Sequence, residues 1–303
     1  MNAAPVLVGY TAAVGFVAPR LLLCAGWPYR APALAAAVWH ALMVSFSIGV
    51  ALAAYNLAMP AEHLHAGLVG LLHSCGMRVG PGEPDPGAAH RLAVALPAAI
   101  GIVLVSSFVF HVVRARRTRT RHREAVDLVG RHSAQLRATV LPYGIPAAYC
   151  LPGRHARVVI SDAAVRELTS EQLNAVLEHE QGHIAGRHHL VLAAGEAFHS
   201  VFRLLPLARH ARERMPLLLE MVADDRALRR HSSEALATAM YEMAAARTPK
   251  GAFAAGGHTV LIRLKRVLGP RKAPHPAFWG SVAAIAAAVP LLPLLVACPP
   301  GLS

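Results

Sequence analysis

The sequence predicts a mainly α-helical, polytopic membrane protein in which four transmembrane helices carry an α+β cytosolic domain, inserted before the last helix. Three observations lead to this fold class. Of the 303 residues, 55% are hydrophobic and only 16% are charged, whereas charged residues approach a quarter of an ordinary soluble domain. The long apolar stretches lie towards the two ends of the chain. Most of the 30 Lys and Arg residues lie in the segment between the last two stretches.

Four apolar stretches have the length of about 20 residues that crosses a bilayer as a helix. They are residues 3–27, 33–59, 92–113 and 277–298. The first is not expected to be a cleaved signal peptide, because it lacks a basic start and a second apolar stretch follows almost at once. The sequence therefore predicts a three-helix region at 1–113, a cytosolic domain at 114–276, and a last helix with a short tail at 277–303.

The orientation follows from the distribution of Lys and Arg, which collect on the cytosolic side of membrane proteins. Six arginines lie between Arg114 and Arg123, and a second basic group lies between Arg263 and Lys272. The loop at 60–91 contains few cations. We therefore expect a multi-pass protein of the cell membrane with both termini outside and residues 114–276 in the cytoplasm.

Within the cytosolic segment, periodicity predicts a helix over 124–136, followed by a proline-broken, turn-rich connector over 141–153. Residues 156–161 are short and β-branched, which favours a strand that ends at a helix cap near Ser161. Thr169 and Gln172 have the spacing of a capping box, so a new helix should begin there. Its apolar stripe includes Leu173, Val176 and Leu177.

This predicted helix carries the sequence His179-Glu180-Gln181-Gly182-His183. A spacing of four residues places the imidazoles of His179 and His183 one turn apart on one helical face, where both can bind one metal ion. Catalytic zinc takes a third protein ligand and keeps an open position for water. Glu180, next to the pair, is placed to accept a proton from that water.

The third ligand is predicted on a later apolar helix, where Glu220 and Asp224 are again one turn apart. A buried carboxylate needs a partner. We expect Glu220 to complete the zinc site and Asp224 to hold the ring of a ligand histidine through its second nitrogen. The alternative is a solvated acidic face, or a salt bridge to Arg226 or Arg229.

The pattern His-Glu-x-x-His followed by Glu-x-x-Ala-Asp resembles that of the gluzincins, a group of zinc peptidases. The order of three spans, a cytosolic domain and a late fourth span is similar to that of the BlaR/MecR-type antirepressor peptidases. Residues 148–153, 158–161 and 186–189 also resemble that family locally. The resemblance implies a gluzincin-type domain with one zinc ion per chain, His179, His183 and Glu220 as ligands, and Glu180 as general base. The β-lactam sensor domain that follows the last helix in the sensors has no counterpart before Ser303.

The resemblance implies a membrane zinc endopeptidase that cleaves a transcriptional repressor or itself in signal transduction. Two alternatives are a housekeeping or processing protease of the HtpX or CAAX type, and a signalling scaffold that holds zinc without turnover. The expected partners are a protein substrate, with a DNA-binding repressor as the candidate, and the lipid bilayer. A homo-oligomer is possible, and direct nucleic-acid binding is not expected.

Several other residues give weaker expectations. The strand at 158–161 could pair with an extended substrate, or could simply belong to a small sheet. On a continuous helix, His188 would point away from His183, so we do not expect it in the site. Arg226, His231 and Tyr241 are candidates for stabilising an oxyanion, but the sequence does not fix their direction. In the loop expected outside the membrane, four histidines could form a metal or pH sensor: His63, His65, His73 and His90. Cys75 and Cys298 could form a disulfide on the same side.

Overall fold

The computed structural model describes residues 3–58, 88–246, 256–270 and 276–297. Four helical segments in these ranges are long and apolar enough to cross a membrane, as the sequence predicts. The first consists of α1 (Ala4–Ala12), the π-helical turn η1 (Ala13–Val17) and α2 (Ala18–Cys24), and the second is α3 (Pro32–Ala58). The third lies in α5 (Ala88–Val129). The fourth consists of α12 (Pro276–Ala288), the 3₁₀ turn η3 (Val289–Leu291) and α13 (Leu292–Ala297).

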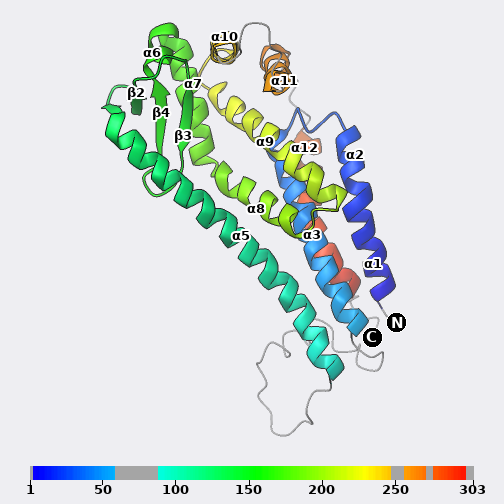
Figure 1. Cartoon of the computed structure of the whole chain (residues 1–303). Coiled ribbons are helices and arrows are strands. Elements are labelled where there is room, and N and C mark those ends of the chain that lie inside the picture. Colours follow the sequence, from blue (N-terminus) through cyan, green and yellow to red (C-terminus); the bar gives the residue numbers. More distant parts are fainter. Residues whose placement is uncertain (1–2, 59–87, 247–255, 271–275, 298–303) are drawn as a thin grey trace.

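The helix that contains the third span does not end at the arginine run, because α5 continues for 42 residues (Figure 1). Residues 114–123 contain neither glycine nor proline, so nothing in this stretch breaks the helix. The helix ends at Val129, before Gly130, and the expected helix over 124–136 is therefore wrong. A single rod connects the membrane segment to the sheet.

The sheet has four strands: β1 (Arg131–Ser133), β2 (Ala138–Leu141), β3 (Ala148–Leu151) and β4 (Arg157–Ser161). Their order is β1-β2-β4-β3, with β2 and β4 parallel and the other pairs antiparallel. The predicted strand at 156–161 is confirmed as β4, but it lies inside the sheet. The stretch 141–153 is more than a connector, because it contains β3, an edge strand.

Six helices follow the sheet: α6 (Asp162–Glu167), α7 (Ser170–Ala185), α8 (His188–Val201), α9 (Pro206–Ala227), α10 (Ser233–Ala245) and α11 (Gly256–Leu268). The predicted caps are present. The Ala164 amide donates to Oγ of Ser161 at 3.1 Å, and Thr169 and Gln172 form the capping box of α7. The apolar stripe of α7, including Leu173 and Val176, packs against the sheet. The position of α7 is therefore set by its cap and by this stripe.

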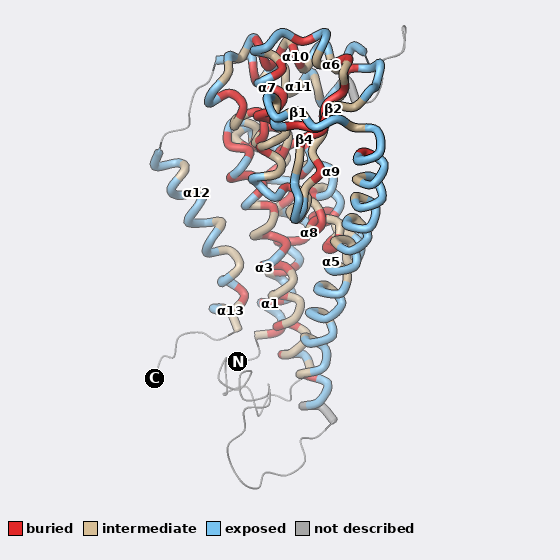
Figure 2. The backbone as a smooth tube through the Cα atoms, turned by 90° about the vertical axis from the view of Figure 1, so that its left-hand side faces the viewer, coloured by how far each residue is buried: buried red, intermediate tan, exposed pale blue. Residues whose placement is uncertain are grey.

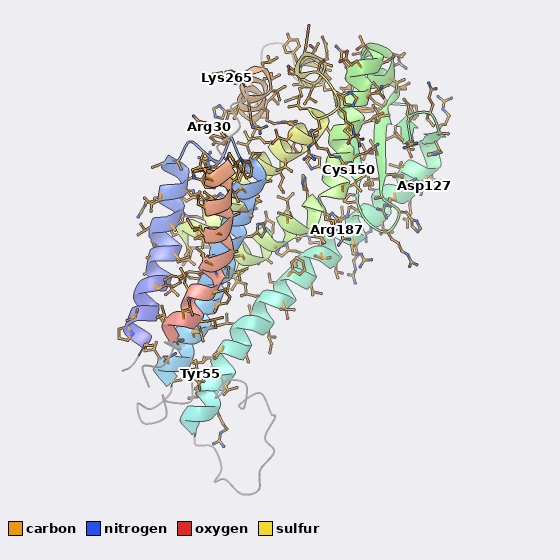
Figure 3. The ribbon with its side chains drawn as sticks, turned by 180° about the vertical axis from the view of Figure 1, so that it is seen from behind. Arg30, Tyr55, Asp127, Cys150, Arg187 and Lys265 are labelled. Carbon is orange, nitrogen blue, oxygen red and sulfur yellow. The ribbon has the colours of Figure 1, made fainter. Side chains whose placement is uncertain are left out.

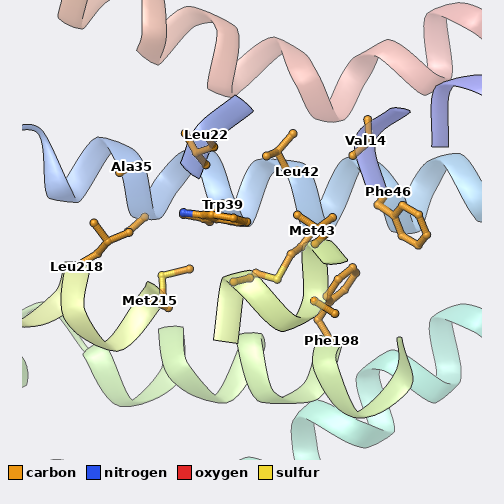
Figure 4. Packing of buried hydrophobic residues seen from close by; sticks show 14 of the residues in the cluster. Val14, Leu22, Ala35, Trp39, Leu42, Met43, Phe46, Phe198, Met215 and Leu218 are labelled. Carbon is orange, nitrogen blue, oxygen red and sulfur yellow. The ribbon is translucent and has the colours of Figure 1, made fainter. Parts of the chain in front are cut away.

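The hairpin of α8 and α9 packs among the spans (Figure 1). One buried cluster joins Trp39 and Phe46 of α3 to Phe198 of α8 and to Met215 and Leu218 of α9 (Figure 4). The segment expected to form a separate cytosolic domain thus shares a core with the first two spans. Among membrane helices, close van der Waals packing stabilises association, so this shared core attaches the hairpin to the spans.

Buried residues gather around α3, α7 and α9, whereas α5 and α12 are largely exposed (Figure 2). Arg30, in the turn between the first two spans, lies at the same end of the molecule as Lys265, and Tyr55 lies at the opposite end (Figure 3). Arg30 and Lys265 therefore lie at one end of the spans, whereas Arg91 lies near the start of α5, at the other end (Figure 1, Figure 3). Which side of a membrane this end faces remains a prediction.

Candidate metal centre

A close approach of α7 and α9 builds the centre. Gly182 faces Ala223, and a Cβ atom at Gly182 would lie 3.3 Å from the Ala223 Cα atom and 3.2 Å from Cδ of Arg226. Both distances are tighter than ordinary van der Waals contacts, so a larger residue would push the helices apart. Two small residues thus bring Glu220 of α9 beside the histidines of α7.

The three predicted ligands converge on one point. The Nε2 atoms of His179 and His183 are 3.2 Å apart. Oε2 of Glu220 is 3.5 Å from Nε2 of His179, and Oε1 is 3.3 Å from Nε2 of His183. A tetrahedron with metal–ligand bonds of 2.0–2.1 Å has edges of about 3.3–3.4 Å. Each donor pair has a separation close to this edge length, with the two histidines facing different oxygens of Glu220, and the three residues form a group that could hold a metal ion.

Asp224 lies beside the first of these histidines. Its side chain is completely buried, and Oδ1 lies 3.0 Å from Nδ1 of His179. The direction of approach does not give Nδ1 a hydrogen bond of good geometry. Burial alone would lower the pKa of His179, but its contacts with Asp224 and Glu220 raise it to about 9 in the metal-free chain. Metal binding at Nε2 must displace a proton.

Glu180 lies between the two histidines on α7, facing β3. Burial raises the pKa of its carboxyl group above the ordinary value, against the opposing effect of His179 and His183. The thiol of Cys150 on β3 contacts this carboxyl group, and burial together with the charge of Glu180 raises the pKa of Cys150 to about 12. Glu180 thus has the partly desolvated setting that suits a general base.

Arg263 on α11 binds both acids of the centre, a role that its place in a basic group does not predict. Its Nε and Nη2 atoms donate to the two carboxylate oxygens of Asp224 at 2.8 and 2.6 Å. Nη1 donates to Oε2 of Glu220 at 2.7 Å. Burial alone would raise the pKa of Glu220, but His179, His183 and Arg263 together lower it. Glu220 is therefore ionised and held in place.

His188 belongs to the centre, contrary to the prediction. The helix breaks after α7, where Arg187 adopts a left-handed conformation with φ of 48°, and α8 starts in a new direction (Figure 1). Nδ1 of His188 lies 2.8 Å from Nδ1 of His183. A Cβ atom at Gly186 would collide with the ring of His188, so a larger residue there would displace this ring. His188 contacts the nitrogen of His183 that faces away from the ligand cluster, and it is not a fourth ligand.

The remaining candidates lie elsewhere. Arg226 binds Glu178 at 2.8 Å and is not paired with Asp224. His231 follows the end of α9, and Tyr241 is largely exposed on α10. His63, His65, His73, Cys75 and Cys298 fall outside the described residues, as do the side-chain surroundings of His90.

With this geometry established, the chain was compared with known proteins. Residues 113–245 match Peptidase family M48. The matched segment extends from α5 to α10 and contains His179, Glu180, His183, Glu220 and Asp224. Neither curated proteins nor solved structures gave a match.

The match indicates a metallopeptidase of a family that is often membrane-associated and typically zinc-dependent. It covers less than half of the chain, and Arg263 lies outside it. It does not select the BlaR/MecR-type peptidases. A group of residues that could hold a metal ion is what a metallopeptidase requires, so the centre is consistent with the family match.

Proposed function

We propose that this protein is an integral membrane zinc endopeptidase with one zinc ion per chain, held by His179, His183 and Glu220. The observation that carries the proposal is the set of donor distances among these residues, 3.2–3.5 Å, with a general base next to them on α7. Zinc bound there would supply a Lewis acid that acidifies water and polarises a peptide carbonyl.

The proton transfers fall to Glu180. Its carboxylate accepts a proton from the attacking water and later delivers it to the leaving amine. Arg263 keeps Glu220 ionised, Asp224 fixes the ring of His179, and His188 fixes the ring of His183. None of these three positioning residues touches the peptide bond that is cleaved. A purely structural metal site needs no base, and it closes its fourth position with a protein ligand.

An extended substrate would pair with the edge strand β3, not with β4 as the sequence suggested. β4 has β2 on one side and β3 on the other, so both of its edges are taken. β3 pairs with β4 alone among the described strands, and its Cys150 thiol contacts Glu180. Addition of a strand to a sheet edge is a common mode of peptide recognition, and here it would deliver the peptide to the base.

We propose that the substrate is a DNA-binding repressor or the chain itself, and that it is cleaved at the cytosolic face of the cell membrane. The order of the spans and the local resemblance of 148–153 and 186–189 to the BlaR/MecR-type peptidases support this choice. A processing protease of the HtpX or CAAX type uses the same centre, and the family match fits it equally well. Direct contact with nucleic acid is not required, and the oligomeric state is left open.

The test uses the full chain reconstituted in lipid nanodiscs, with two kinds of substrate. One is a soluble unfolded protein, and the other is the same protein fused to a transmembrane anchor. Wild type should cleave internal peptide bonds, chelation of zinc should stop cleavage, and Glu180→Ala should be inactive. Release of single terminal residues only, or cleavage that survives Glu180→Ala, would overturn the endopeptidase proposal. Cleavage of a co-expressed repressor but not of either unfolded protein would favour the signalling role over processing.

A further inference from the structure

The arginines of α5 divide between two faces of the helix. Arg123 faces the protein, where its Nη2 atom donates to the carbonyl oxygens of Leu151 and Pro152 at 3.2 and 2.7 Å. Arg114, Arg117 and Arg121 lie on the other face and are exposed. Arg123 thus helps to hold the sheet against α5, whereas the three arginines on the other face have no such role among the residues that the structure describes.

The outer arginines border a hollow of about 690 Å³ on the surface of α5. Its lining is amphipathic and includes the apolar Val105, Val109 and Phe110 and the basic Arg114, Arg117 and Arg121. A second hollow of about 400 Å³ adjoins it and shares Arg117 and Arg121. We call this surface the outer α5 face.

The positive charge of this face is not balanced by the protein. Within the described part of the chain, the ion pairs found for arginine do not include Arg114, Arg117 or Arg121. Residues 92–123 of α5 contain no Asp or Glu. Elsewhere in the chain, arginines such as Arg157 and Arg212 are paired with carboxylates. The outer α5 face is therefore suited to an anion from outside the protein.

The heights of these residues match the layers of a bilayer. The apolar stretch of α5 ends at Val113, and at 1.5 Å per residue Arg117 lies about 6 Å and Arg121 about 12 Å further along the axis. The headgroup region adds about 5–7 Å on each side of the hydrocarbon core, and a tilt of the helix reduces these heights. Arg114 and Arg117 thus lie within the layer of the lipid phosphates. Arg121 starts beyond its outer edge, but side chains on a helix point towards the N-terminus, which directs this long side chain back to the phosphates. Val105 and Val109 lie at the level of the acyl chains.

We propose that the outer α5 face is a binding site for an anionic phospholipid. The phosphate would accept hydrogen bonds from Arg114, Arg117 and Arg121, since the planar guanidinium group binds phosphate through paired donors. An acyl chain would lie along Val105, Val109 and Phe110. A nucleic acid would satisfy the arginines but not the apolar half of the hollow. The proposal does not depend on the peptidase activity.

The experiment measures bound lipid by native mass spectrometry after the full chain is released from vesicles of equal phosphatidylglycerol and phosphatidylcholine. Three proteins are compared with wild type. Arg117→Gln/Arg121→Gln removes two charges from the outer α5 face, and Arg117→Lys/Arg121→Lys keeps them. The matched control, Arg131→Gln/Arg229→Gln, removes two charges from exposed positions on β1 and at the end of α9.

Wild type should retain phosphatidylglycerol in preference to phosphatidylcholine. Since each basic residue near a membrane surface contributes about 1 kcal/mol, the Gln variant should lose up to about 30-fold of this preference. The Lys variant should keep most of it, and the control should behave as wild type. Equal retention of the two lipids by wild type would overturn the proposal. So would an equal loss in the control, or displacement of the lipid by an oligonucleotide in a parallel competition.

Discussion

Nη1 of Arg263 lies 2.7 Å from Oε2 of Glu220, the oxygen that also faces Nε2 of His179 at 3.5 Å. The same guanidinium group binds both oxygens of Asp224. One arginine of α11 therefore holds the third metal ligand and the acid that supports the first. Arg266, one turn later, donates to the backbone oxygen of Tyr29 at 2.6 Å, in the turn between the first two spans. Helix α11 thus connects the metal centre to the membrane segments.

Arg263→Met should weaken zinc binding by about 10- to 100-fold, the usual effect of removing a group that supports a metal ligand. It leaves two carboxylates without their cation, and loss of one partner of a buried ion pair typically costs about 3–5 kcal/mol of stability. Arg263→Lys should recover part of the affinity, because it keeps the charge but loses the paired geometry. Zinc affinity is measured by competition with a chelator, using only the protein that remains folded in each variant. Unchanged zinc affinity in Arg263→Met would contradict this role.

Asp224→Asn should also lower zinc affinity by about 10- to 100-fold, because the carboxylate next to Nδ1 of His179 raises the basicity of that ligand. The amide keeps the size of the side chain, so the fold should persist. Zinc titration with a competing dye measures the effect. Asp225→Asn is the control, since Asp225 binds Arg266 and not a residue of the metal centre. An equal loss in both variants would point to a general effect on α9.

His188→Ala should reduce kcat/KM about 10-fold or more and weaken zinc binding, because the ring of His183 loses the partner that orients it. His188→Asn should restore part of both, since an amide can accept the hydrogen bond from Nδ1 of His183. Gly186→Ala should resemble His188→Ala, because the added Cβ atom collides with the His188 ring. His189→Ala serves as the neighbouring control. Normal zinc affinity in both His188→Ala and Gly186→Ala would refute the assignment.

Cys150 should resist alkylation across the neutral range. Its pKa of about 12 leaves almost no thiolate at pH 7–9, and the thiolate is the reactive form. Because the pKa is raised, the rate of modification should increase as pH rises towards 12. Labelling with iodoacetamide, followed by mass spectrometry, provides the measurement. The charge of Glu180 contributes to the shift, so Glu180→Gln should make Cys150 react faster at the same pH. Rapid labelling of wild type at pH 7 would show that the thiol is not held against Glu180.

The local parts of the centre could be predicted because they depend on the geometry of single helices. His179 and His183 lie one turn apart on α7, and Glu220 and Asp224 lie one turn apart on α9. Likewise, the four spans follow from apolar length alone. In each case the information lies within one uninterrupted stretch of sequence, where spacing determines position.

The remaining parts depend on contacts that spacing does not encode. Arg263 lies 43 residues after Glu220, on a helix that carries no motif of its own. The position of His188 does not follow from its spacing to His183, because Arg187 takes a left-handed conformation and interrupts the helix between them. The sheet was largely missed because its strands are short and β1 is polar. The edge position of β3 follows from a strand order that does not follow the sequence.

The central claim is that His179, His183 and Glu220 hold zinc while Glu180 performs the proton transfers. The most direct measurement is the zinc content and the cleavage rate of purified Glu180→Gln beside wild type, in the same membrane mimetic. We predict one zinc per chain in both proteins and a loss of cleavage of at least about 100-fold in the variant, the lower end of the usual contribution of a general base. Wild-type cleavage by Glu180→Gln, or wild type without zinc, would contradict the account.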